Sequence, residues 1–217
     1  MPPLRLVAFD MEGTLTHDPT VWEVMHRKLG TWESHGLKYW ERYCAGEIEY
    51  DDFARLDVEV WRGTPVSLLD ESVAEVPLKP GCVELLNALH ERGVHTAIIS
   101  NGLLRMAERL VRECGVHTAL ANRAHVEDGL LTGDLDILVP YEAKGTALLQ
   151  LMADFSVTPE QTAAVGDSRS DGAMFAEAGL GVAFCPSDEH VARNAHHVIE
   201  VNDLREVGRI LIGRPIP

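Results

Sequence analysis

The fold is decided by residues 6–9, Leu-Val-Ala-Phe, which run directly into residues 10–14, Asp-Met-Glu-Gly-Thr. An apolar run that ends abruptly in acidic residues is typical of a buried parallel strand that carries a carboxylate to its carboxyl end. In open α/β sheets, ligands bind at that edge. Asp10 and Glu12 lie two residues apart, so in an extended chain their side chains point the same way. Such a pair can divide the work of nucleophile and general acid/base, bind a hard cation together, or serve only as a helix N-cap.

The composition is that of an ordinary globular protein and excludes several classes of partner. The chain has 217 residues, of which 46% are hydrophobic, and its net charge is −15 at pH 7. Such a charge argues against nucleic acid or an anionic membrane as a partner. Because there is neither a long apolar run nor a signal-peptide pattern, the sequence predicts a cytoplasmic protein. The four separated cysteines predict buried thiols rather than a zinc site or a disulfide framework.

Most of the chain alternates between strand-like and helix-like segments. Strands are expected at residues 4–9, 94–99, 162–165, 181–184 and 197–201, and helices at residues 82–92, 103–114, 142–154, 188–194 and 203–212. A hairpin with turns at residues 128–129 and 132–133 is expected between them, and a capping box at residues 158–161 begins a short helix. The alternation predicts an α/β fold, with a Rossmann-like, three-layer core around a parallel sheet.

Residues 16–76 differ in character from the rest. They hold all four tryptophans and three of the four tyrosines, and they contain no convincing buried strand. Apolar residues recur at helical spacing, as in Val21 and Met25, which suits amphipathic helices. We therefore predict a core domain made of residues 1–15 and 77–217, with the intervening residues inserted as a small helical cap domain.

Two further strands also end in polar residues. Ser100, Asn101 and Gly102 follow the strand expected at residues 94–99. Asp167 and Asp171 follow the strand expected at residues 162–165. Because the carboxyl ends of parallel strands meet at one edge of a sheet, we expect these residues to lie beside Asp10 and Glu12. Lys144, one of only four lysines, begins an expected helix, where the helix dipole disfavours a cation. This placement favours a functional reason for the lysine over a solvated surface position.

The four segments together resemble a known family. In order, DMEGT (residues 10–14), IISNG (98–102), a lone Lys144 before glycine, and GDSRSD (166–171) resemble the motifs of the haloacid dehalogenase superfamily of phosphatases. The nearest resemblance is to its phosphoserine-phosphatase-like branch, in which a helical insertion forms a cap. It implies a Mg²⁺-dependent phosphomonoester hydrolase that acts on a small phosphorylated metabolite through an aspartyl-phosphate intermediate.

The resemblance also implies roles for the catalytic and phosphate-binding residues. Asp10 would be the nucleophile, and Glu12 would protonate the leaving alcohol and later activate water. Ser100 and Lys144 would hold the phosphoryl oxygens, assisted by the backbone N–H groups near residues 101–102. These roles agree with the physics, because phosphoryl transfer needs alignment and charge neutralisation more than elaborate covalent chemistry.

A metal site is implied in the same way. Mg²⁺ would be bound by Asp10, by the backbone carbonyl of Glu12 and by Asp167, with Asp171 and Ser170 behind them as a second layer. Hard oxygen ligands of this kind suit Mg²⁺. The family usually has aspartate at the position of Glu12, and the branch often has asparagine at that of Ser170. Acid/base work by a glutamate stays feasible because its intrinsic pKa is close to that of aspartate.

The cap departs from the branch more strongly. Phosphoserine phosphatases hold the serine amino group with a glutamate shortly after the first motif, and this chain has Asp-Pro-Thr there, at residues 18–20. They hold the serine carboxylate with a cap arginine, and this chain has Asp57 there, with Arg55 and Arg62 close enough in sequence to substitute. These differences count against phosphoserine as the substrate.

The aromatic residues of the cap offer a different hint about the substrate. They are Trp22, Trp32, Tyr39, Trp40, Tyr43 and Trp61. They either face the site, where they would receive an apolar or cationic leaving group by stacking or cation–π contact, or pack the cap's own core or a homodimer surface. Two other functions stay open: a phosphotransferase of the same mechanism, and a non-catalytic regulatory module that binds a phosphorylated ligand.

Overall fold

The apolar segment β1 (Leu6–Phe9) lies at the centre of a seven-stranded sheet, and all four of its residues are buried. The structure is a computed structural model that describes residues 3–216. Its strands follow the order β4-β3-β2-β1-β5-β6-β7, and neighbours are parallel except β3 and β4. The other strands are β2 (His95–Leu103), β3 (Thr118–Glu127), β4 (Leu130–Asp136), β5 (Thr162–Gly166), β6 (Leu180–Phe184) and β7 (His197–Ile199).

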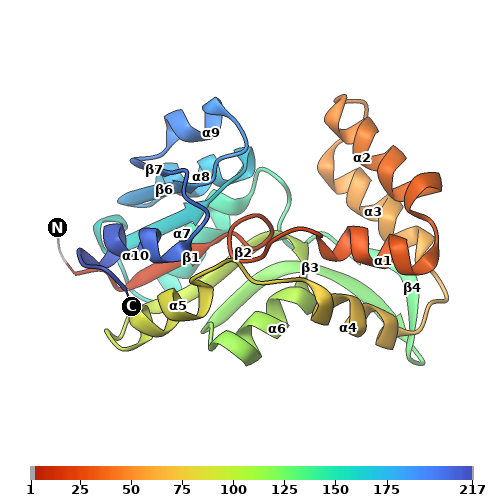
Figure 1. The fold of residues 1–217 in the computed structure, drawn as a ribbon, viewed down its shortest axis with the longest axis horizontal. Coiled ribbons are helices and arrows are strands. Elements are labelled where there is room, and N and C mark those ends of the chain that lie inside the picture. The colour runs from red at the N-terminus through yellow and green to blue at the C-terminus, as the bar shows by residue number, and fades with distance from the viewer. Residues whose placement is uncertain (1–2, 217) are drawn as a thin grey trace.

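Helices cover both faces of the sheet (Figure 1). Those of the core are α5 (Cys82–His90), α6 (Leu104–Cys114), α7 (Lys144–Asp154), α8 (Gly172–Glu177), α9 (Glu189–Asn194) and α10 (Leu204–Ile212). Because successive strand residues point to opposite faces, Val7 and Phe9 pack toward α5, α6 and α10, whereas Leu6 and Ala8 pack toward α7, α8 and α9. The predicted Rossmann-like, three-layer α/β core is confirmed.

Residues 17–76, between β1 and α5, form helices with no strand beyond a single bridge at Pro65. The helices are α1 (Val21–Leu29), α2 (Leu37–Cys44), α3 (Tyr50–Val60) and α4 (Val66–Glu75), with a short π-helical turn at Trp32–Gly36. We refer to α1–α4 as the cap helices. In Figure 1, α2 and α3 stand beside the carboxyl edge of the sheet, while α4 lies next to α6. The division into two domains at these boundaries stays a prediction.

Three local expectations were wrong. Of the four cysteines predicted to be buried, Cys44 is exposed and Cys185 is partly exposed. β2 runs through residues 100–102 to Leu103 instead of ending at residue 99, and its pairing with β3 shifts register on the way. Residues 132–133 form no turn, because they belong to a bulge in β4 in which residues 132–134 face residue 125 alone. Gly133 has a positive φ within this bulge, which is why it resembles a turn residue in the sequence. Within residues 3–216, every helix is too short or too polar to span a bilayer.

Candidate active site

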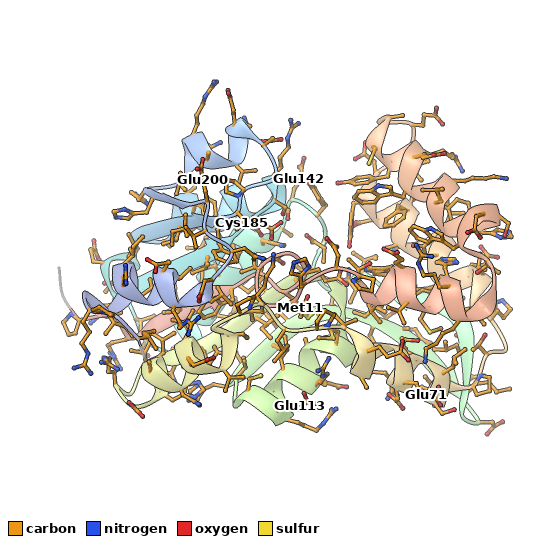
Figure 2. The ribbon with its side chains drawn as sticks, viewed as in Figure 1. Met11, Glu71, Glu113, Glu142, Cys185 and Glu200 are labelled. Carbon is orange, nitrogen blue, oxygen red and sulfur yellow. The ribbon has the colours of Figure 1, made fainter. Side chains whose placement is uncertain are left out.

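The centre of the site is a buried lysine held between two aspartates. Lys144 Nζ lies 2.7 Å from Asp10 Oδ1 and 2.6 Å from Asp171 Oδ1. Asp10 stands directly after β1, and its side chain and that of Lys144 are almost wholly buried. Figure 2 shows Met11, the residue after Asp10, at the junction of the sheet and the cap helices. A charged lysine is stable in such a place only because both carboxylates compensate it.

Local packing brings Lys144 to this position. It is the first residue of α7, as predicted, and Gly145 follows it. A Cβ at Gly145 would lie 2.8 Å from the carbonyl oxygen of Ala173, so only glycine lets α7 approach α8 this closely. Asp171 immediately precedes α8, so this close approach sets Lys144 against it.

Asp171 is fixed by hydrogen bonds within its own loop. Its Oδ2 accepts the backbone N–H groups of Asp167 and Ser168 at 3.0 and 2.8 Å, and the Ser168 hydroxyl at 2.9 Å. The hydroxyls of Ser168 and Ser170 lie 2.9 Å apart. Asp171 therefore uses one oxygen to hold the loop and the other to hold Lys144.

Asp167 is held by the turn after β1. Thr14 Oγ1 donates a hydrogen bond of 2.7 Å to Asp167 Oδ1. Gly13 has φ +91°, and a Cβ there would lie 2.5 Å from Asp167 Oδ2. The turn after β1 therefore requires glycine on two counts, backbone conformation and space. Oxygens of Asp10, Asp167 and Asp171 lie within 4.8 Å of one another.

Negative charge exceeds positive charge in this centre. Burial raises the pKa of the Asp10 carboxyl, although Lys144 opposes this. Burial and the charges of Asp10 and Asp171 hold the pKa of Asp167 well above its ordinary value. Raised carboxyl pKa values mean that the ionised forms lack a compensating cation. A divalent metal ion would supply that charge, so the residues present fit such an ion.

Glu12 points into the site from the turn after β1. Its Oε2 accepts a hydrogen bond of 3.0 Å from Trp22 Nε1 in α1, whereas its Oε1 is buried without a partner among residues 3–216. A Cβ at Gly102 would lie 2.9 Å from Oε2, so glycine makes room for the longer acid. Burial raises the pKa of Glu12 to about 7, and the Trp22 hydrogen bond opposes that rise. A carboxyl with this pKa can both donate and accept a proton near neutral pH.

The end of β2 brings Ser100 beside these groups and turns Asn101 away. Ser100 Oγ accepts the backbone N–H of Gly102 at 3.0 Å, and both residues line the same cavity as Asp10. Asn101 Nδ2 donates to the carbonyl oxygen of Val139, so its side chain braces the loop before α7. Asn122, on β3, donates to the Asn101 carbonyl oxygen at 2.6 Å.

Sequence reasoning assigned no role to Asn122, which is fully buried. Its Oδ1 accepts the backbone N–H groups of Leu138 and Val139, each at 2.9 Å. It therefore ties β2 to the loop that leads to Lys144. Asparagine is uncommon in strands, so its presence in a β-prone segment could have indicated a specific role for Asn122. Thr14 and Trp22 were seen in the sequence, but their contacts with Asp167 and Glu12 were not predicted.

A cavity of about 670 Å³ connects this centre to the cap helices. Four of the six aromatic residues singled out in the sequence line it: Trp22, Trp32, Trp40 and Tyr43. Tyr39 and Trp61 do not line it, and Trp61 is buried in the packing of the cap helices. Four of the rings therefore border the cavity, Trp61 packs among the cap helices, and contact with a leaving group stays a prediction.

The two arginines considered for binding a carboxylate do not line this cavity. Arg62 packs against Gly133 and lies 3.7 Å from Asp134 on β4. Arg55 is exposed on α3. Asp57 does line the cavity, and its Oδ1 lies 2.9 Å from His26 Nε2. The cap thus offers a carboxylate to this cavity, and no arginine from residues 16–76 lines it.

The fold and this site define a class of hydrolases. A family model for haloacid dehalogenase-like hydrolases matches residues 4–179, and the chain belongs to this family. Within the family, it is a phosphatase of the phosphoserine-phosphatase-like branch.

Three similar proteins support the assignment to this branch. A phosphoserine phosphatase of Methanocaldococcus jannaschii is 31% identical over 204 residues, which cover 94% of this chain and 95% of the relative. A solved substrate-bound phosphoserine phosphatase complex is 27% identical with a TM-score of 0.86, over 97% of this chain and 100% of the other. A phospho-aspartyl intermediate analogue of phosphoserine phosphatase is 28% identical with a TM-score of 0.85, over 96% and 99%.

Proposed function

We propose that the protein hydrolyses a small phosphomonoester with Asp10 as nucleophile and Glu12 as general acid and base. The observation that carries this proposal is the pairing of Lys144 with Asp10 beside a Glu12 oxygen that has no partner. Lys144 orients the Asp10 carboxylate and presents a positive charge toward incoming phosphoryl oxygens. The Ser100 hydroxyl and the backbone N–H groups near Asn101 and Gly102 would donate hydrogen bonds to the same oxygens, for which the Gly102 N–H must leave Ser100 Oγ.

Magnesium is the ion we expect here, because this family typically uses it and the donors are hard oxygens. Asp10 and Asp167 would hold it, together with the backbone carbonyl of Glu12. When bound, Mg²⁺ reduces the repulsion between the carboxylate nucleophile and a dianionic ester. Asp171 is a weaker candidate for a direct ligand, because both its oxygens are already occupied by Lys144 and the loop.

Asp10 and Glu12 then carry out the reaction in two steps. In the first, an Asp10 oxygen forms a bond to phosphorus while the ester P–O bond breaks, and Glu12 gives its proton to the leaving oxygen. In the second, Glu12 takes a proton from water as the water oxygen attacks phosphorus, which releases phosphate and restores Asp10. A Glu12 pKa of about 7 suits both halves of this cycle.

Phosphoserine is the first substrate to test. The relatives carry its name, at identities near 30% over almost the full chain. This counts against the sequence-based doubt about phosphoserine, which came from Asp57 and residues 18–20. The relatives match this chain over almost its full length, whereas Asp57 and residues 18–20 belong to the cap alone.

The test measures phosphate release from O-phosphoserine and p-nitrophenyl phosphate, with Mg²⁺ and with EDTA. Wild-type protein is compared with Asp10→Asn. We expect Mg²⁺-dependent turnover that falls by about 10³-fold or more in the variant, because an amide cannot act as the nucleophile. Asp154→Asn, an exposed aspartate on α7, is the matched control and keeps full activity. Full Mg²⁺-dependent turnover in Asp10→Asn contradicts the proposal.

A further inference from the structure

The cap end of the cavity is walled by aromatic rings in contact with one another. Tyr43 has its ring centroid 5.7 Å from that of Trp40 and 5.7 Å from that of Phe53. Tyr43 also meets Tyr141 of the core, at 6.5 Å. Tyr141 lies in the loop before α7, three residues ahead of Lys144. The aromatic wall therefore runs from the cap helices to the edge of the phosphate site.

The same cavity is strongly acidic. Seven carboxyl groups line it, against one lysine and one arginine. Lys144 is held between Asp10 and Asp171, and Arg169 is paired with Asp188 at 2.6 Å. Among residues 16–76, no lysine or arginine lines the cavity, whereas three carboxyl groups do: Asp18, Glu23 and Asp57. A leaving group with a positive charge gains from both the ring faces and this negative potential.

Two of the three carboxyl groups at the cap end are each paired through one oxygen. Glu23 Oε1 accepts from Arg27 Nε at 2.7 Å, and Asp57 Oδ1 lies 2.9 Å from His26 Nε2. A primary ammonium group has three N–H donors that each need an acceptor. A quaternary ammonium group has none, and it binds through the faces of aromatic rings. Six aromatic side chains of the cap line the cavity against three carboxyl groups, and this balance favours the quaternary group.

We propose that the cap end of the cavity binds a quaternary ammonium group. The preferred substrates are then phosphomonoesters of a choline-like amino alcohol that lacks a carboxylate. This inference rests on the proposed function, since the ester would be cleaved at the core end of the same cavity. A carboxylate on the leaving group would meet no lysine or arginine from residues 16–76 in this cavity, and Arg62 lies against Asp134 instead.

The test compares kcat/KM for phosphocholine and for 3,3-dimethylbutyl phosphate. The second ester has carbon in place of the quaternary nitrogen, so the shape is kept and the charge is lost. We expect phosphocholine to be preferred by about tenfold or more, which corresponds to two cation–π contacts of ordinary strength. We also expect phosphocholine to exceed O-phosphoserine.

Trp40→Leu locates the effect in the aromatic wall. Trp40 is 46% exposed, so the substitution removes a ring near the surface of the cap, and leucine keeps an apolar side chain against Tyr43 and Phe53. The preference for phosphocholine over its uncharged isostere should fall by about threefold or more, mainly through KM. Tyr39→Leu is the matched control, because Tyr39 is the neighbouring residue on α2 and does not line the cavity. It leaves the preference unchanged.

The outcomes separate this inference from the proposed function. The inference is overturned if kcat/KM is equal for the two isosteric esters, or if O-phosphoserine is preferred tenfold over phosphocholine. In either case, Asp10-dependent hydrolysis of p-nitrophenyl phosphate still upholds the proposed function. A preference that survives Trp40→Leu unchanged overturns the assignment to the aromatic wall. No hydrolysis of any ester by the wild type overturns both.

Discussion

The core end of the cavity and its cap end hold charge in different ways. At the core end, Lys144 sits between Asp10 and Asp171, and each of these contacts is direct and buried. At the cap end, the rings of Tyr43 and Phe53 form the wall, and Glu23 and Asp57 are each paired through one oxygen with a cap residue. The core end can bind one group of fixed shape and charge, the phosphoryl group. The cap end can bind leaving groups of different shapes through ring contacts, with a preference for positive charge.

The two ends also differ in what sets the positions of their side chains. The core end is assembled from strand ends and helix starts, so its geometry follows from the sheet itself. The cap end is assembled from α1–α3, and an exposed ring such as Trp40 lies outside the hydrogen bonds that hold Lys144, so it can change without disturbing the phosphate site. Substitutions at the two ends should therefore have separable effects on reaction chemistry and on substrate choice.

Lys144→Met should cause the largest combined loss. It leaves Asp10 and Asp171 buried without their shared cation, and breaking a buried ion pair costs about 3–5 kcal/mol of unfolding free energy. Turnover should fall by about a hundredfold or more, because the phosphoryl oxygens lose a positive contact. Urea denaturation and steady-state kinetics measure the two losses. Lys38→Met, at an exposed lysine of α2, should change neither, and an unchanged stability in Lys144→Met would contradict the packing described for the core end.

Glu12→Gln should act on the chemistry without disturbing phosphate binding. An amide cannot protonate the leaving alcohol, so kcat for an alkyl phosphate should fall by about 10²–10⁴-fold. With p-nitrophenyl phosphate, the leaving group needs no proton, and only the second step is impaired. We expect a burst of nitrophenol followed by slow turnover, measured by stopped flow. Unchanged steady-state turnover of p-nitrophenyl phosphate would show that Glu12 has no role in the second step, and slow release without a burst would contradict the claim that the first step needs no proton for this ester.

Gly13→Ala should damage the core end through geometry alone. The new Cβ would lie 2.5 Å from Asp167 Oδ2 at a residue with φ +91°. We expect a loss of about 2–3 kcal/mol in unfolding free energy and a higher Mg²⁺ requirement for turnover, because Asp167 must move. Gly46→Ala is the matched control, since Gly46 has φ +71° and nothing within 4 Å. It should cost about 1 kcal/mol and leave the Mg²⁺ requirement unchanged.

The parts that were predictable from the sequence depend on short segments. Residues 6–14 show a buried strand and its acidic end because both features are local, and the same holds for the loop around Asp167 and Asp171. Lys144 stood out because a lysine at a helix start is unfavourable unless something compensates it. Sheet topology then brings these residues together without further information.

The parts that were not predictable depend on contacts between distant segments. Asn122 holds the loop before α7 through backbone groups of residues 138 and 139, and no local pattern encodes those partners. β2 continues past residue 99 because side-chain hydrogen bonds from Asn101 and Asn122 stabilise its irregular end. The hydrogen bond from Trp22 to Glu12 joins a cap helix to the turn after β1, so it exists only once both elements are placed.

That last contact provides the smallest and most specific prediction, because it joins the two ends of the cavity. The N–H of Trp22 favours the ionised form of Glu12, so Trp22→Phe should raise the Glu12 pKa above its value of about 7. Hydrolysis of an alkyl phosphate needs protonated Glu12 and therefore declines as pH rises through that pKa. In Trp22→Phe, the decline should move to higher pH by about 1 unit. The measurement is the pH dependence of kcat/KM. Trp32→Phe, which also lines the cavity but donates no hydrogen bond to Glu12, should leave the profile in place. A shift toward lower pH in Trp22→Phe would show that cap and core are coupled through burial of Glu12 rather than through this hydrogen bond.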